Sequence, residues 1–70
     1  MEQNELLELV AEILEVESVA LTDDLADKGW DSLSNLTFIA EVDERVGVEV
    51  DADGLAHAVT VADLLPLTRA

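Results

Sequence analysis

The chain contains no cysteine and a single histidine, His57, among its 70 residues. The missing cysteines exclude disulfide bonds, a thiolate nucleophile and a cysteine-based zinc site. The sequence places no further metal-binding residues with the lone histidine, so we interpret His57 as a surface residue and expect no metal site there. The scattered serines offer no nucleophile paired with a base, and we therefore expect that the protein is not an enzyme.

Basic residues are almost as scarce. Lysine and arginine together number three, against 17 acidic residues, and the formal net charge is −14. Such a polyanion repels the phosphates of nucleic acids and anionic lipids, so we expect neither as a partner. It is attracted to basic patches on other proteins. Strong charge also favours disorder, but 50% of the residues are hydrophobic and they recur periodically, which predicts a folded chain.

Long apolar runs are absent as well. The first residues, from Met1 to Glu5, are acidic and lack the apolar centre of a signal peptide. No run approaches the roughly 20 residues that span a membrane as a helix. We therefore expect a soluble, cytoplasmic monomer with no membrane partner, formed by a single domain over residues 1–70.

Residues 4–16 have the periodicity of an amphipathic helix. At about 100° per residue, the apolar side chains share one half of the helical wheel. These are Leu6, Leu7, Leu9, Val10, Ile13, Leu14 and Val16. The other half, which we interpret as a solvated face, carries Glu5, Glu8, Glu12 and Glu15.

The periodicity is lost over residues 17–31, which predicts a long loop. Val19, Leu21 and Leu25 are spaced to place apolar anchors on the core. The only tryptophan, Trp30, is expected to pack at the edge of the core, because aromatic side chains mostly contribute packing. The alternative is a partly exposed wall beside Ser32.

A second helix is predicted over residues 32–46, with Asp31 as its N-cap, Ser32 as its first residue and Gly47 as a left-handed cap at its end. The side expected to face the core carries Leu36, Phe38, Ile39, Val42 and Val46. The side expected to face solvent carries Leu33, Thr37, Ala40, Glu41 and Glu44, with Asp43 on its flank. Leu33 and Ala40 would thus form an apolar strip bordered by acids, which favours a docking surface.

The elements that follow are short. We expect an extended connector over residues 48–50 with a buried valine, because a lone strand has nothing to pair with. Residues 49–54 resemble the start of a calcium-binding loop, but Thr60 stands where such a loop needs a bidentate glutamate, so we expect no calcium.

A short helix is predicted over residues 53–59, with its inward-facing side formed by Leu55, Val59 and, as a weaker candidate, Ala56. Residues 60–63 have the pattern of a capping box and predict a last helix. Pro66 should kink or fray that helix, because proline lacks the backbone donor.

These elements sum to an all-α bundle of three main helices and one short helix with a long first loop. Ser32 stands at a helix start, where unpaired N–H groups and a partial positive charge suit an attached phosphate ester. Without a neighbouring base, a serine is a poor nucleophile. We therefore interpret Ser32 as an attachment point.

With these residues in place, the sequence resembles the acyl carrier proteins. The resemblance lies in the Asp31-Ser32-Leu33 motif, in residues 29–30 before it and in residues 43–48 at the end of the helix that follows. It extends through residues 50–51 and 60–64, and so covers nearly the whole chain. It implies the four-helix bundle of that family.

The resemblance further implies that a phosphopantetheinyl transferase moves a 4′-phosphopantetheine arm from coenzyme A onto Ser32. The thiol of the arm would hold an acyl group as a thioester for enzymes that load, condense or transfer it. Asp31 would cap the helix and help the transferase to recognise the site. The residues implied to meet the basic surfaces of these enzymes are Leu33, Thr37, Ala40, Glu41, Asp43 and Glu44.

Some residues depart from the pattern of fatty-acid carriers, which usually have acids two and five places after the serine. Here Ser34 and Thr37 are neutral, and Trp30 replaces a small residue. These departures favour a carrier of specialised metabolism, such as a polyketide pathway, over housekeeping fatty-acid synthesis. The alternatives are a peptidyl or aminoacyl carrier, and an acidic docking module that is never modified.

Overall fold

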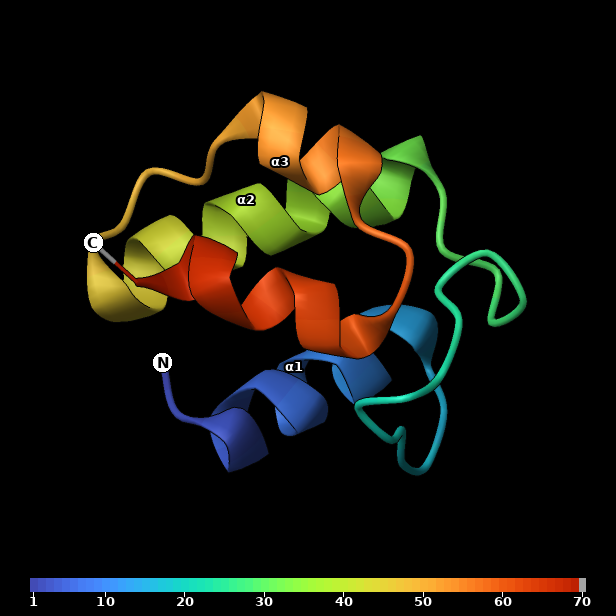
Figure 1. Cartoon of the computed structure of the whole chain (residues 1–70). Helices are drawn as coiled ribbons and strands as arrows, with labels where there is room; N and C mark the ends of the chain where they lie inside the picture. Colours follow the sequence, from blue (N-terminus) through green and yellow to red (C-terminus); the bar gives the residue numbers. More distant parts are fainter. Residues whose placement is uncertain (70) are drawn as a thin grey trace.

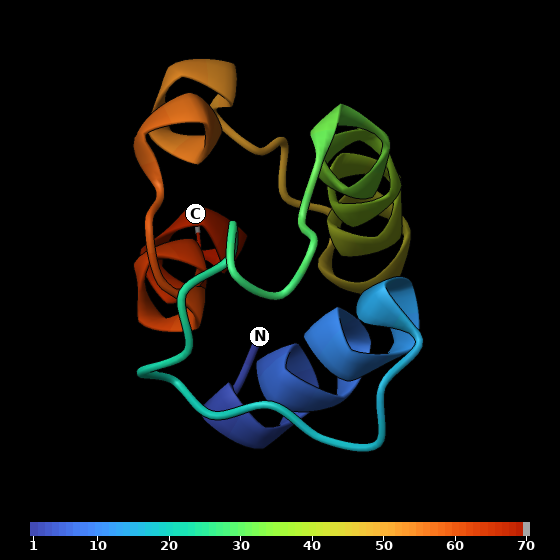
Figure 2. The ribbon, with the colours of Figure 1, turned by 90° about the vertical axis from the view of Figure 1, so that its right-hand side faces the viewer.

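The computed structural model describes residues 1–69, which form four helices (Figure 1). These are α1 (Gln3–Leu14), α2 (Ser32–Val46), α3 (Ala52–His57) and the 3₁₀ helix η1 (Val61–Thr68). α1 and α3 lie at opposite edges of the bundle, with α2 and η1 between them (Figures 1 and 2). The predicted all-α bundle with a long first loop is confirmed. Within residues 1–69, no helix has the length and apolar character needed to span a membrane.

Helix α1 starts one residue earlier and ends two residues earlier than predicted. It ends in a left-handed turn at Glu15, which has a φ of 58°. The N–H groups of Glu15 and Val16 donate to the carbonyls of Glu12 and Ala11, at 3.2 and 3.0 Å, and so satisfy the last turn. Glycine usually occupies such a turn, so the pattern contained no stop signal. Val16 leaves the apolar face and is exposed, contrary to expectation.

Replacing Glu15 by glycine is expected to stabilise the fold by about 0.5–1 kcal/mol. A left-handed conformation costs an L-residue roughly 1–2 kcal/mol, of which the greater chain entropy of unfolded glycine offsets about 0.5–1 kcal/mol. Urea unfolding measures the difference. Glu8→Gly is the matched control, because it removes the same charge from the interior of α1 and should destabilise by about 1 kcal/mol. Equal effects of the two changes would contradict the prediction.

The core draws on every helix, on the first loop and on the connector before α3. Its buried members are Leu6, Leu9, Val10, Leu25, Phe38, Val42, Val50, Leu55, Val61 and Leu64. Val19, Leu21 and Trp30 pack against them from the loop, as predicted. The rings of Trp30 and Phe38 meet edge to face, with their centroids 5.9 Å apart. Trp30 therefore closes the edge of the core.

Besides Val16, three residues expected in the core are not there. Leu36 is 65% exposed, because the inward side of α2 is centred on the fully buried Phe38 and Val42. At about 100° per residue, Leu36 lies about 160° from Phe38 around the helix. Val59 is 58% exposed, because α3 ends at His57 and the helical period does not reach it. Ala56 is exposed as well.

The first loop is fastened to the start of η1 by main-chain hydrogen bonds. The Leu25 N–H donates to the Val59 carbonyl at 2.9 Å, and the Val61 N–H donates to the Asp23 carbonyl at 3.0 Å. Figure 2 shows this loop crossing the end of the bundle. The bonds hold the segment that leads into α2.

Helix η1 begins as predicted, because the Asp63 carboxylate accepts a hydrogen bond from the Thr60 N–H at 3.0 Å. The expected kink or fraying at Pro66 is wrong. The 3₁₀ helix continues to Thr68, whose hydroxyl donates to the Leu65 carbonyl at 2.7 Å. Proline fixes φ near −65°, which a 3₁₀ helix accepts.

Candidate functional site

Asp31 and Ser34 define the start of α2. The backbone of Asp31 is extended, and its Oδ1 accepts hydrogen bonds from the Ser34 N–H at 2.9 Å and from the Ser34 hydroxyl at 3.1 Å. The first hydrogen bond of the helix runs from the Asn35 N–H to the Asp31 carbonyl at 3.0 Å. Asp31 is therefore the N-cap, and Ser32 is the first residue of the helix, in agreement with the predicted start.

Sequence reasoning missed the part played by Ser34, which it treated only as a departure from an acidic pattern. Ser34 is buried, and both of its donors point to one carboxylate oxygen. The signal was the spacing, since an N-cap side chain bonds two or three residues ahead. These two bonds, led by the one from the backbone N–H, lower the pKa of Asp31 below its ordinary value.

Asp31 is expected to stabilise the fold at neutral pH and to lose that effect in acid. A carboxylate whose pKa is lowered by folding contributes stability above its unfolded pKa, near 4. The contribution is lost as the pH falls through the lowered pKa. Urea midpoints of native protein and Asp31→Ala should therefore differ at pH 7 and converge in acid. A difference that does not shrink would show that the carboxylate charge is irrelevant.

The loop that leads to Ser32 is held against the first turn of α2. The indole N–H of Trp30 donates to the side-chain oxygen of Asn35. Gly29 has a φ of 88°, a left-handed conformation that favours glycine. These two features fix the path of the chain into the helix.

Ser32 is exposed between Asp31 and Leu33. The Asp31 carboxylate is engaged with Ser34, and the Nδ1 of His57 lies 2.7 Å from the carbonyl of Asp53 in α3. These groups bond to Ser34 and Asp53, and neither bonds to the Ser32 hydroxyl. In residues 1–69, no three acidic or histidine side chains are grouped to hold a metal ion. The arrangement suits a hydroxyl that accepts a group from another protein.

An exposed apolar strip follows Ser32 along α2 and consists of Leu33, Leu36 and Ala40. Leu33 is 69% exposed. Leu36 belongs to this strip and not to the core. It lies three residues after Leu33 and four residues before Ala40, and residues so spaced are neighbours on a helix surface, so the spacing could have predicted its position. Thr37 borders the strip, with its hydroxyl donating to the Leu33 carbonyl at 3.1 Å.

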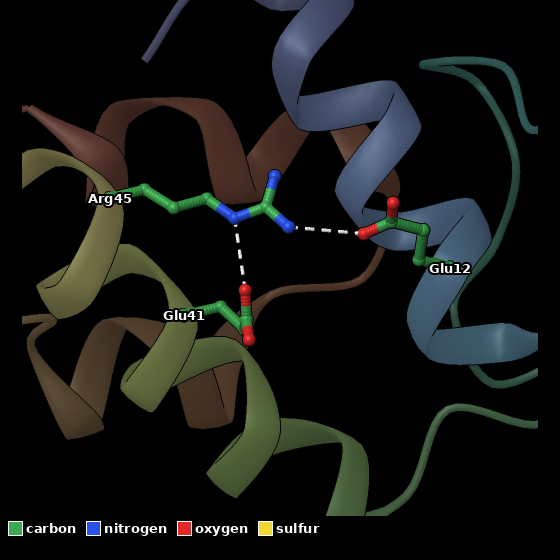
Figure 3. A network of polar contacts seen from close by, with 3 residues as sticks. All are labelled: Glu12, Glu41 and Arg45. Atoms are coloured by element: carbon green, nitrogen blue, oxygen red, sulfur yellow. Dashed lines mark hydrogen bonds and ion pairs between the residues drawn. The ribbon is translucent and has the colours of Figure 1, made fainter.

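The acidic residues proposed for docking differ in their surroundings. Asp43 and Glu44 are exposed. Glu41 is half-buried, and its carboxylate accepts a hydrogen bond from Arg45 at 2.9 Å. Arg45 also reaches Glu12 of α1 (Figure 3). The sequence pattern placed Glu41 on the side expected to face solvent, and it did not indicate the contact between Arg45 and Glu12.

A groove of about 440 Å³ lies between the end of α1 and the start of α2. Its α2 side is formed by residues on both sides of Ser32, namely Asp31, Leu33, Ser34 and Thr37. Its α1 side is formed by Glu12, Ile13, Leu14 and Glu15, and the loop contributes Lys28 and Gly29. A partner that approaches Ser32 therefore meets two helices.

Comparison with known proteins agrees with this geometry. A family model described as a phosphopantetheine attachment site matches residues 4–65. The match runs from α1 into η1 and includes Ser32 and the apolar strip. Neither the curated proteins nor the solved structures gave a significant match.

Proposed function

The chain belongs to the phosphopantetheine attachment site family, and from this membership we propose that Ser32 is the residue to which the arm is attached. Members of the family carry a 4′-phosphopantetheine prosthetic group, and the domain is a carrier without catalytic function of its own. The observation that carries the proposal is an exposed serine hydroxyl on the first residue of a capped helix.

The residues around Ser32 fit a phosphodiester. The first N–H groups of α2 and its partial positive charge favour a phosphate at this end of the helix. The Oδ1 of Asp31 is held by the two donors of Ser34. The thiol of the arm supplies the thioester chemistry, which explains how a chain without cysteine handles acyl groups.

Transfer of the arm is a reaction at the Ser32 oxygen. A phosphoanhydride bond of coenzyme A breaks as a phosphodiester bond to the serine oxygen forms. Adenosine 3′,5′-bisphosphate leaves, and the hydroxyl proton is removed by the transferase. In this step the chain itself supplies the serine oxygen and holds it in position. We propose that Asp31 is also read by the transferase, since it is the exposed charge next to Ser32.

Partner enzymes would dock on the apolar strip and the residues around it. A carrier domain interacts with a phosphopantetheinyl transferase and with acyl-handling enzymes. Leu33, Leu36 and Ala40 supply apolar contact area, with Thr37 beside them. Asp43 and Glu44 supply charge for the basic patches of these enzymes.

We propose that the cargo belongs to specialised metabolism, such as a polyketide pathway, or is a small or aminoacyl unit. The support is the neutral character of Ser34 and Thr37 and the presence of Trp30 before the motif. Ser34 is buried against the cap, so an acid at this position would place a second carboxylate beside Asp31. Isolating the loaded protein and weighing its acyl group would identify the cargo.

The direct test of the proposed site is modification by a transferase with coenzyme A, followed by intact mass spectrometry. One phosphopantetheine should be added to the native chain. An unmodified chain in the presence of an active transferase would favour the alternative of an acidic docking module that never carries an arm.

A further inference from the structure

A single guanidinium joins the two longest helices at their surface (Figure 3). The Nε of Arg45 donates to Glu41 at 2.9 Å, and its Nη2 donates to Glu12 at 3.1 Å. The hydrogen bond with Glu41 is the main cause that raises the pKa of Arg45. Glu12 is 64% exposed, and exposed ion pairs contribute little to stability. Another cation can therefore take the place of Arg45 at little cost.

A small cavity lies beside these two carboxylates. It has a volume of about 120 Å³ and is lined by Leu9, Glu12, Ile13, Thr37 and Glu41. Leu9 is buried and Ile13 is half-buried, so the inner part is apolar, whereas the carboxylates are more exposed. Arginine and lysine side chains combine an apolar stem with a charged end. The cavity matches that chemistry.

The cavity continues the groove that runs past Ser32. Both are lined by Glu12, Ile13 and Thr37, and the groove extends from there to Asp31 and Leu33. A protein that reaches Ser32 across Leu33 and Thr37 therefore also lies over this cavity. The net charge of −14 favours a partner whose contact surface is basic.

We propose that the cavity between α1 and α2 receives one arginine or lysine side chain of a basic partner enzyme, whose charge replaces Arg45 between Glu12 and Glu41. This inference rests on the proposed function, because the partners are the enzymes that act at Ser32. It extends the docking surface from α2 to α1. Arg45 then occupies the site in the free protein and weakens docking.

The first test measures modification of Ser32 by a transferase as a function of carrier concentration. Arg45→Gln should lower the KM for the carrier about two- to five-fold and leave kcat unchanged, a range that corresponds to an exposed ion pair. Arg69→Gln is the matched control, because it removes the same charge at an exposed position near the end of the chain. Glu12→Gln added to Arg45→Gln should cancel the gain. Equal effects of the two arginine changes would overturn the proposal.

The second test needs no enzyme. In Arg45→Ala, n-propylguanidinium should bind in the cavity. Its binding should shift the NMR signals of the Glu12 and Glu41 carboxyl carbons and of the Ile13 and Thr37 amides, and these shifts should saturate as its concentration rises. The shifts should weaken at least several-fold when Glu12→Gln is added. Absence of saturable shifts would overturn the cavity proposal even if Ser32 is modified. A chain that binds the guanidinium but is never modified would instead overturn the proposed function alone.

Discussion

Replacing Ser32 by alanine is expected to abolish the addition of phosphopantetheine. The attachment needs an oxygen at the position of Ser32, and the nearest other serine, Ser34, is buried with its hydroxyl bonded to Asp31. Native protein and variant are incubated with transferase and coenzyme A, and their intact masses are compared. The native chain should gain the mass of one arm, and the variant should gain none.

The loss must be separated from misfolding and from a second site. Ser32 is exposed, so its replacement should change stability by less than about 0.5 kcal/mol, and the circular dichroism spectrum should stay helical. Ser18→Ala is the matched control, because Ser18 is an exposed serine outside the helices, and this variant should be modified like the native chain. Modification of Ser32→Ala would show that another residue carries the arm.

The start and end of α2 were predictable because the residues that fix them act locally. Asp31 bonds a group three residues ahead, and Gly47 takes a φ of 68° that favours glycine. The end of α1 was not predictable, because Glu15 adopts the same kind of turn without glycine. A local signal predicts an element only where the residue type matches its conformation.

The inward side of α2 was predicted only in part. The apolar residues of α2 together span an arc of about 220° on the helical wheel, at 100° per residue. Phe38 lies at one end of this arc and Leu33 at the other. One side of α2 faces solvent, so the helix buries less than that arc and some of these residues had to be exposed. Periodicity gives the width of the apolar band, whereas the neighbouring helices decide which part of it is buried. Leu36 was assigned to the wrong part.

Contacts between distant segments left no trace in the pattern. The loop is joined to η1 through main-chain groups, such as the Leu25 N–H and the Val59 carbonyl, which every residue type possesses. The link between Glu12 and Arg45 joins residues 33 positions apart. Predicting it would require the relative placement of α1 and α2. The candidate serine could be found from the sequence, but the groove beside it could not.

Replacing Phe38 by alanine is expected to destabilise the fold by about 3–5 kcal/mol. The side chain is fully buried and supports Trp30 by an edge-to-face contact. A chain of this length has a total stability of roughly 4–10 kcal/mol, so the change removes much of it. Urea unfolding followed by circular dichroism measures the loss, and modification at Ser32 should fall with the folded fraction.

Leu36→Ala is the matched control, two residues away on the same helix. Because Leu36 is exposed, the change should alter stability by less than about 0.5 kcal/mol. It should instead raise the KM of a partner enzyme about five-fold, which corresponds to about 1 kcal/mol, since an apolar contact at the docking surface is lost. A large loss of stability in Leu36→Ala would show that Leu36 belongs to the core after all. An unchanged KM would remove Leu36 from the docking surface and leave Leu33 and Ala40 as its only apolar members.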